Sequence, residues 1–415
     1  MKPSKVRHVK PRHQRYVSVA GFILGPFIRL ILGYKSPRIK VKQYEPFLVV
    51  SNHVTAFDPI LLTMTFGRQV YYVSSELIFS KGLISRMLEH TFAPIPKSKS
   101  QTDITSVKSM IQVVKEGGNV GVFVEGNSTI NGAISNVPAA IGKLVLLLKI
   151  PLIIFNFDGG YLSNPRWASA KRKRHIRGHI RQVLTYDEYK HLTAEELNDL
   201  IIKGINVNAY EESPVYTYDG KHNAEGLHRL LFACPKCQAV NTIKTINDTY
   251  SCLNCGFKMT YDNHGYLHSS EFSNPKNTVE LDLDNKIHYQ ETVLNNPDFT
   301  IRVRAKMSEV FRRRRKHFGM ATLSLSREGL TIDFHRKHLK TLTYSLDELD
   351  TMAMQQKEVL VIYPKNEQTK MALIANAESV SAYQLMVTLQ ILKNERNYLS
   401  KGEALIKLTA TEIGL

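Results

Sequence analysis

A histidine and an aspartate with the spacing of an acid–base pair follow a short apolar segment at residues 47–50. Asn52 and His53 come directly after this segment, and Asp58 follows His53 by five positions. An imidazole whose one nitrogen binds a carboxylate is held in one tautomer, and its other nitrogen can then accept a proton. Five positions on a continuous helix would separate the two side chains by about 140°, so the pair requires a loop that enters a helix. Asp58-Pro59 predicts such a helix start, because proline is tolerated in the first turn.

The pair has two interpretations. In the functional one, His53 removes a proton directly from a bound hydroxyl, since no serine or cysteine stands in an evident nucleophile position beside it. In the simpler one, Asp58 only begins a helix and His53 is an ordinary loop residue. The residues alone leave both interpretations open.

The four cysteines of the chain form two close pairs. Cys234 and Cys237 enclose two residues, and after fourteen more residues Cys252 and Cys255 do the same. This spacing is typical of a zinc ribbon, in which two turns deliver four thiolates to one structural zinc ion. All four ligands are then protein thiolates, so no position is open for metal catalysis. A redox dithiol pair or disulfides are the alternatives.

The elements around His53 alternate between strand and helix. Apolar strands are expected at residues 47–50, 70–73, 120–124 and 151–157, with helices from Asp58, around 107–114 and over 134–148. This alternation predicts an α/β domain, a mixed or parallel sheet flanked by helices, whose ligands bind at the C-terminal ends of the strands. Asn52-His53 and Glu125-Gly126 both follow such ends, so we expect them to lie together.

Four blocks in this region, in order, resemble those of the glycerolipid acyltransferase superfamily, the lysophosphatidic acid and glycerol-3-phosphate acyltransferases. The resemblance spans residues 46 to about 160 and extends to Gly159-Gly160-Tyr161 and Pro165-Arg166-Trp167, as in bacterial members of unassigned acceptor specificity. The blocks are Asn52-His53 with Asp58, Ala93-Pro94-Ile95-Pro96-Lys97, Phe123-Val124-Glu125-Gly126-Asn127 and Pro151-Leu152-Ile153-Ile154.

The resemblance implies an activity and a set of site residues. His53 would be the general base and Asp58 its orienting partner. A hydroxyl of a lysophospholipid such as 1-acylglycerol-3-phosphate would attack an acyl thioester, and the thiolate of CoA or acyl carrier protein would leave. The residues that the resemblance assigns to substrate binding are Asn52, Lys97, Lys99, Glu125, Gly126, Asn127 and Ser128.

Two positions depart from the family pattern. Val124 replaces a proline, and Ser128 stands where the family has an arginine that is expected to hold a phosphate. A hydroxyl does not replace a planar guanidinium in that role. Either Lys97, Lys99 and Lys108 bind the acceptor phosphate as point charges, or the acceptor is not a simple lysophosphatidic acid.

The charge of the chain predicts an anionic partner. Lys and Arg number 55 against 37 Asp and Glu, a formal net charge of +18. Residues 1–15 hold six of these cations and no acid, and residues 16–28 are uncharged. This pattern predicts a helix that lies on an anionic membrane, peripheral and on the cytoplasmic face; a core helix or a cleaved signal peptide are the alternatives. Basic runs at 166–181 and 302–316 fit either lipid headgroups or solvated charge.

The C-terminal third has a different pattern. Short β segments are expected at residues 278–281, 300–303, 321–325, 330–334, 359–363 and 370–374, followed by a helix that includes residues 383–392. Arg327-Glu328-Gly329 predicts a hairpin turn. A β-rich, barrel-like domain closed by a helix resembles a pleckstrin-homology-like module, for which lipid binding, protein binding and a purely structural role are all open.

We therefore expect four parts: a basic arm with an amphipathic segment (1–45), an acyltransferase domain (46–225), a small zinc ribbon (226–267) and a β-rich pleckstrin-homology-like domain (268–415). The predicted protein is an O-acyltransferase. The alternatives are a non-catalytic protein that binds membrane lipids and a zinc-ribbon protein that binds nucleic acid. Nucleic acid is not the expected partner, because basic and aromatic residues do not alternate around the ribbon.

Overall fold

The computed structural model forms two compact units. Unit 1 comprises Met1–Thr129, Ala133–Ser163 and Lys173–Tyr216, and unit 2 comprises Ile130–Gly132, Asn164–Arg172 and Thr217–Leu415. The residues that the structure describes are 7–37, 39–75, 78–79, 82–97, 104–126, 128–134, 137–170, 172–211, 216–311, 314–336, 338–355, 357, 359–365, 370–375 and 380–400.

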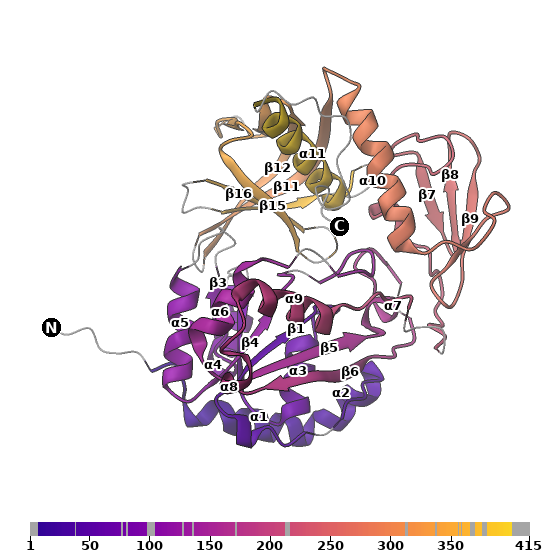
Figure 1. Cartoon of the computed structure of the whole chain (residues 1–415). Helices are drawn as coiled ribbons and strands as arrows, with labels where there is room; N and C mark the ends of the chain where they lie inside the picture. The colour runs from indigo at the N-terminus through magenta and orange to yellow at the C-terminus, as the bar shows by residue number, and fades with distance from the viewer. Residues whose placement is uncertain are drawn as a thin grey trace. The chain divides into compact units, whose positions relative to one another are not determined.

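Unit 1 contains a mixed six-stranded sheet in the order β3-β2-β4-β1-β5-β6 (Figure 1). β1 pairs in parallel with β4 and β5, whereas β6 runs antiparallel to β5. The C-terminal end of β1, which His53 follows, therefore lies between the C-terminal ends of two neighbouring strands. The strands are β1 (Leu48–Ser51), β2 (Val70–Ser75), β3 (Ile95–Lys97), β4 (Asn119–Phe123), β5 (Leu152–Asp158) and β6 (Arg177–Leu184).

Helices cover both faces of this sheet. Successive β1 residues point to opposite faces: Val50 packs in one buried apolar cluster with side chains of α5, α6 and α9, and Val49 packs in another with side chains of α2 and α3. The helices are α1 (Pro11–Ile23), α2 (Gly25–Leu32), α3 (Asp58–Phe66), α4 (Leu83–Thr91), α5 (Ile104–Lys115), α6 (Ala140–Leu148), α7 (Gly160–Ser163), α8 (Tyr186–Tyr189) and α9 (Ala194–Ile205).

One helix of unit 1 is shorter than its sequence pattern predicts. Apolar spacing suggested a helix from residue 134, but α6 begins at Ala140. Pro138 explains the difference, because a proline disfavours helical geometry in the residue before it, here Val137.

The N-terminal segment consists of two helices. Within the described part of the chain, no single helix is long and apolar enough to cross a membrane. α1 and α2 together would meet that requirement in length and composition, but they are bent by 59° at their break.

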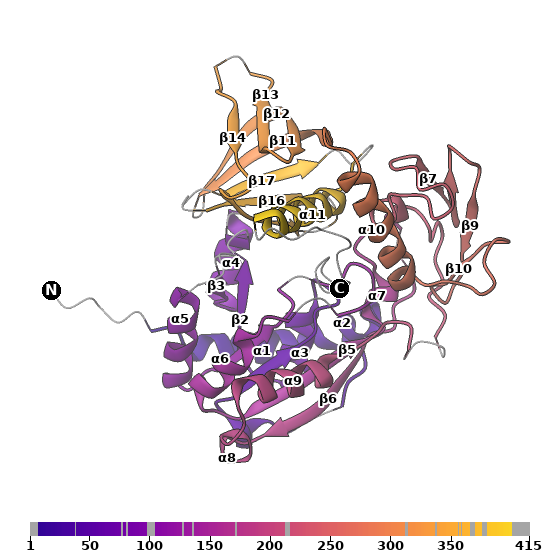
Figure 2. The ribbon, with the colours of Figure 1, turned by 45° about the horizontal axis from the view of Figure 1, so that its top comes forward.

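Unit 2 contains a small antiparallel sheet in the order β10-β9-β8-β7 and a seven-stranded antiparallel sheet in the order β14-β13-β12-β11-β17-β16-β15. α11 (Ala382–Ser400) packs on the larger sheet (Figure 2). The strands are β7 (Ile243–Ile246), β8 (Thr249–Cys252), β9 (Lys258–Tyr261), β10 (Leu267–His268), β11 (Thr300–Phe311), β12 (Arg314–Ser326), β13 (Gly329–Phe334), β14 (Leu342–Tyr344), β15 (Leu349–Gln355), β16 (Val359–Pro364) and β17 (Lys370–Ala375).

The predicted fold class is confirmed: an α/β part, a four-cysteine cluster and a β-rich region with a terminal helix. The predicted hairpin turn at 327–329 is also present, since β12 ends at Ser326 and β13 begins at Gly329. The prediction of a strand at 278–281 is wrong. These residues begin α10 (Thr278–Leu294), because Asn277 and Glu280 form a capping box that outweighs the β-branched pair Thr278-Val279.

The units divide the chain differently from the four predicted parts. The ribbon and the seven-stranded sheet belong to the same unit, as do residues 130–132 and 164–172.

Part of the basic run at 166–181 is buried. Arg172 is only 5% exposed, and its guanidinium lies 5.0 Å from the ring centroid of Trp167 and 4.5 Å from that of Tyr261. A guanidinium stacks well on aromatic faces. Arg172 is therefore neither a solvated charge nor a headgroup ligand.

Candidate active site

Asn52 joins two strands at the edge where His53 lies. Its Nδ2 donates to the carbonyl oxygen of Phe157, and its Oδ1 accepts from the N–H of Phe157, each at 2.8 Å. Because Asn52 is buried and both ends of its amide are bound in this way, its position is structural. The contact of Asn52 with substrate stays a prediction.

The side chains of His53 and Asp58 are in contact. His53 Nδ1 lies 2.8 Å from Asp58 Oδ2, which also accepts the N–H groups of Val54 and Thr55 at 2.7 and 2.9 Å. Thr55 Oγ1 donates to the other oxygen, Oδ1, at 2.6 Å. Because this carboxylate accepts every bond it makes, Nδ1 of His53 carries the hydrogen, and Nε2 presents a lone pair.

The solvent exposure of the two side chains also fits an Nε2 that accepts a proton from a bound molecule. The carboxylate of Asp58 is fully buried, whereas the ring of His53 is 20% exposed. Among the described residues, none forms a hydrogen bond with His53 Nε2. The geometry thus provides a fixed imidazole with one nitrogen available to a bound molecule.

Aromatic rings hold the imidazole in place. The ring of Phe123, at the end of β4, stacks on His53 with centroids 4.6 Å apart, and Tyr72 of β2 stacks on Phe123 at 5.6 Å. Burial raises the pKa of Tyr72, which keeps its hydroxyl neutral. No site role was predicted for Phe123, because its position at the end of an apolar strand is equally typical of the core.

The loop after β4 binds both backbone groups of His53. Glu125 Oε1 accepts the N–H of His53 at 2.8 Å, and the N–H of Thr129 donates to the carbonyl of His53 at 2.9 Å. Gly126 in this loop has φ +69°, a backbone conformation that favours glycine. No atom lies within 4 Å of the position that its Cβ would take, so a side chain there would not clash. The predicted meeting of the two motif loops is therefore observed. Thr55 and Thr129 were missed, since Thr55 is one of the unspecified positions between His53 and Asp58, and Thr129 follows the block that contains Glu125.

Of the lysines predicted to bind phosphate, the described ones, Lys97 and Lys108, do not lie beside His53. Lys97 is exposed at the C-terminal end of β3, the end of the sheet where His53 also lies. Two strands separate β3 from β1, however, which places the two strands roughly 14 Å apart at the usual strand spacing. Ser128 precedes Thr129 in the loop and is half-buried. Lys99 and Asn127 lie outside the described residues, and Lys108 is exposed on α5.

A second histidine–carboxylate pair lies in unit 1. Nε2 of His179 on β6 is 2.7 Å from Asp158 Oδ2 at the end of β5, and the ring of His179 is 41% exposed. This pair differs from the first because its carboxylate is not fully buried.

The four cysteines form one cluster in unit 2. Their sulfur atoms all lie within 4.8 Å of one another, with 3.7 Å between Cys234 and Cys255 and between Cys237 and Cys252. A tetrahedral zinc ion with Zn–S bonds of about 2.3 Å requires sulfur atoms roughly 3.8 Å apart. The donor set and its spacing therefore fit a structural zinc ion.

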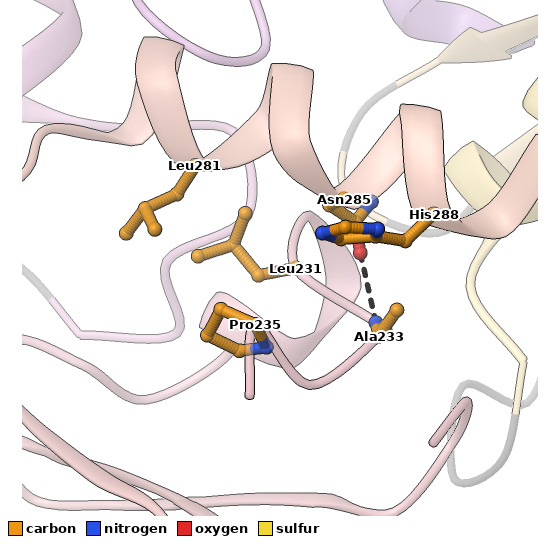
Figure 3. A pocket seen from close by; sticks show the side chains of 6 residues that line it. All are labelled: Leu231, Ala233, Pro235, Leu281, Asn285 and His288. Atoms are coloured by element: carbon orange, nitrogen blue, oxygen red, sulfur yellow. Dashed lines mark hydrogen bonds between the residues drawn. The ribbon is translucent and has the colours of Figure 1, made fainter. Parts of the chain in front are cut away.

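α10 supports the first cysteine turn. Ala233, which precedes Cys234, donates its N–H to Asn285 Oδ1 of α10 at 2.8 Å (Figure 3). A small pocket lies beside this bond, and among the described residues that line it His288 is the one titratable side chain. It therefore holds no acid–base pair like that of His53 and Asp58. The residues that line the pocket are Leu231, Ala233, Pro235, Leu281, Asn285 and His288.

A comparison with protein families finds a match to the region that contains the His53 site. The family model described as Acyltransferase matches residues 36–156, which include His53, Asp58 and Glu125. This part of the chain therefore matches an acyltransferase domain. The resemblance to the glycerolipid acyltransferases is confirmed at the level of this domain. His179 and Asp158 lie outside the matched residues.

Solved structures with local similarity include two from different classes. One is the 1-acyl-sn-glycerophosphate acyltransferase PlsC from Thermotoga maritima, with 15% identity, a TM-score of 0.38, and coverage of 46% of this chain and 76% of that one. Another contains the PH and C1 domains of the Vav1 exchange factor, with 12% identity, a TM-score of 0.16, and coverage of 28% and 38%. None of the curated proteins matches the sequence.

Proposed function

We propose that the acyltransferase domain transfers a fatty acyl chain from the thioester of CoA or acyl carrier protein to a hydroxyl of a lysophospholipid, such as 1-acylglycerol-3-phosphate. The observation that supports this most is the contact between His53 and Asp58, which leaves His53 Nε2 as the proton acceptor. The base stands in the part of the chain that matches the family.

In the proposed reaction, Nε2 of His53 removes the proton of the acceptor hydroxyl as its oxygen bonds to the thioester carbonyl carbon. The carbonyl electrons move to oxygen, and when they return the carbon–sulfur bond breaks. The thiolate leaves and takes the proton from the imidazolium, which restores neutral His53. Asp58 stabilises the imidazolium and keeps the ring in position.

Acceptor binding is proposed to depend on lysine. With Ser128 in place of the family arginine, Lys97 is a described cation at the end of the sheet where His53 lies. A lysine ammonium acts as a point charge on a flexible stem. Lys97, and Lys99 after it, would then attract the acceptor phosphate without the bidentate geometry of arginine.

The N-terminal helices are proposed to lie on the cytoplasmic face of an anionic membrane, which makes the enzyme a peripheral membrane protein. Phe22 and Leu30 are 86% and 81% exposed, and other large apolar side chains around the bend are exposed too: Val19, Ile23, Leu24, Phe27 and Ile31. Basic residues precede them at 7–15. An exposed apolar surface beside cationic side chains is typical of interfacial binding.

The cysteine cluster is proposed to hold a structural zinc ion through Cys234, Cys237, Cys252 and Cys255. When bound, zinc would cross-link the two cysteine turns. Since all four donors are protein thiolates, the site would be closed and would take no part in acyl transfer.

Product analysis tests the proposed function. The purified full-length protein receives mixed lysolipids and one labelled acyl thioester, either acyl-CoA or acyl carrier protein, and products are identified by mass spectrometry. A labelled diacyl phospholipid is the expected product. Association with vesicles without any acylated product would contradict the enzyme and support a lipid-binding protein. A salt-dependent complex with DNA or RNA, again without product, would support a nucleic-acid-binding protein.

A further inference from the structure

The loop that follows the Glu-Gly motif has its tip in unit 2. Thr129 belongs to unit 1, where its N–H binds the carbonyl of His53 and its Oγ1 donates to the carbonyl of Ala133 at 2.6 Å. The bond to Ala133 joins the two ends of the loop. The tip between Thr129 and Ala133, Ile130–Gly132, belongs to unit 2. A short segment that follows the contact with His53 is therefore held by residues far away in the sequence.

Asn131 makes two hydrogen bonds from this tip to α10. Its Nδ2 donates to Asp282 Oδ2 at 3.1 Å, and its carbonyl accepts from Thr278 Oγ1 at 2.6 Å. Asn131 is buried, and Asp282 and Thr278, both on α10, are fully buried. Ile130 packs against the apolar core of the same unit. Hydrogen bonds that are shielded from water in this way are costly to break without a replacement.

The carboxylate that holds Asn131 is itself anchored. Lys286 Nζ lies 3.2 Å from Asp282 Oδ2, and the hydroxyl of Tyr383 on α11 donates to both carboxylate oxygens at 2.8 and 3.0 Å. Lys286 balances the charge of Asp282 inside unit 2. The charge of Asp282 is therefore balanced even without the loop, whereas Asn131 obtains its hydrogen bonds from α10. This asymmetry indicates that the contact serves the loop.

We propose that Asn131, Thr278 and Asp282 are positioning residues for acyl transfer: the contacts of α10 with Asn131 fix the loop at 128–133 and, through Thr129, the backbone of His53. This inference rests on the proposed function. Release of the tip frees the Thr129 N–H that holds the His53 carbonyl, and small displacements of a base lower the rate of the chemical step strongly.

Hydrogen exchange of the full-length protein measures the positioning directly. The test variants are Asn131→Ala, which removes the donor to Asp282, and Thr278→Val, which removes the donor to the Asn131 carbonyl at nearly constant volume. Tyr289→Phe is the matched control, because it removes a buried hydroxyl bond between α10 and α11, to Thr388 at 2.8 Å, without touching the loop. Amides in a peptide over 124–133 should exchange at least tenfold faster in both test variants and unchanged in the control.

Kinetics separates positioning from general destabilisation. The turnover number of Asn131→Ala should fall about tenfold or more while KM for the acyl thioester changes little, and Tyr289→Phe should keep both values. Unchanged exchange in Asn131→Ala would overturn the proposal, and so would faster exchange with a normal turnover number. If Asn131→Ala does not fold, Thr278→Val decides by the same criteria.

The two proposals fail separately. A wild-type protein that acylates no lysolipid refutes the proposed function, and the exchange measurement still decides whether α10 holds the loop. Normal wild-type transfer with no effect of either test variant refutes the positioning role alone.

Discussion

Glu125 accepts the backbone N–H of His53 at 2.8 Å, which joins two motif loops that are 72 positions apart in the sequence. The carboxylate therefore holds the base by its main chain, and Thr129 holds the neighbouring carbonyl. Glu125 thus has a structural role beside His53 that does not require contact with substrate.

This relationship predicts different effects for two substitutions of Glu125. Glu125→Gln retains an oxygen that can accept the His53 N–H and should keep most activity. Glu125→Ala removes the acceptor, a loss of about 1.5–3 kcal/mol for a bond to a charged group, and should lower the turnover number tenfold or more. Steady-state kinetics with a saturating acyl thioester measures both. Equal losses in the two variants would instead indicate that the charge itself takes part in the reaction.

Asp58→Asn should separate folding from catalysis. An asparagine can still accept at the oxygen that faces His53 and the two loop N–H groups, and Thr55 Oγ1 can rotate to accept from the new amide. The negative charge that stabilises the imidazolium is lost. We expect turnover to fall on the order of 10³–10⁴-fold, with a change in unfolding free energy of only about 1–3 kcal/mol. Near-normal turnover in a folded Asp58→Asn protein would argue against the pair.

The bend between α1 and α2 should determine membrane binding. Phe22→Asp and Leu30→Asp remove large exposed apolar groups, each worth roughly 1.5–3 kcal/mol when buried in lipid. Cosedimentation with vesicles that contain an anionic lipid should show about a tenfold loss of affinity for each. Ile246→Asp, at an exposed apolar position on β7, is the control and should bind as wild type. Vesicle binding that is insensitive to both substitutions would exclude this surface.

Stability should fall as the pH is lowered from 6.5 toward 4, because of His13. Burial lowers the pKa of His13 on α1 to about 4, and its Nδ1 is bonded to the hydroxyl of Tyr71 at 2.9 Å. The unfolded chain, with an ordinary histidine pKa of about 6.5, binds a proton more readily in that range, so protonation favours unfolding.

The variant His13→Gln tests this assignment, since it retains a group able to bond Tyr71 and does not titrate. The melting temperature of the wild type should decline more steeply between pH 6.5 and 4 than that of the variant. Parallel declines in the two proteins would show that His13 is not responsible.

Much of the site follows from local sequence. Asp58-Pro59 begins a helix as expected, and this places the carboxylate against a loop histidine five positions earlier. The apolar runs likewise correspond to buried strands, because a strand covered on both faces has to be apolar throughout.

Other parts depend on contacts that are distant in the chain. The resemblance assigned Lys97 to substrate binding, but in the sheet order β3-β2-β4-β1 two strands lie between the strand of Lys97 and the strand before His53. Asn52 was assigned to substrate, and only the pairing of β1 with β5 reveals its bonds to Phe157. The contact of Asn131 with α10 has no local signal, because its partners come about 150 residues later.

The most direct test of the account compares two histidines of unit 1. His53→Ala and His179→Ala each remove an imidazole that is paired with a carboxylate, and acyl transfer from a labelled thioester to a lysophospholipid is measured in a single turnover. The account predicts that His53→Ala loses transfer by at least 10²-fold while remaining folded, and that His179→Ala keeps it. Transfer at the wild-type rate by a folded His53→Ala protein would show that His53 is not the base.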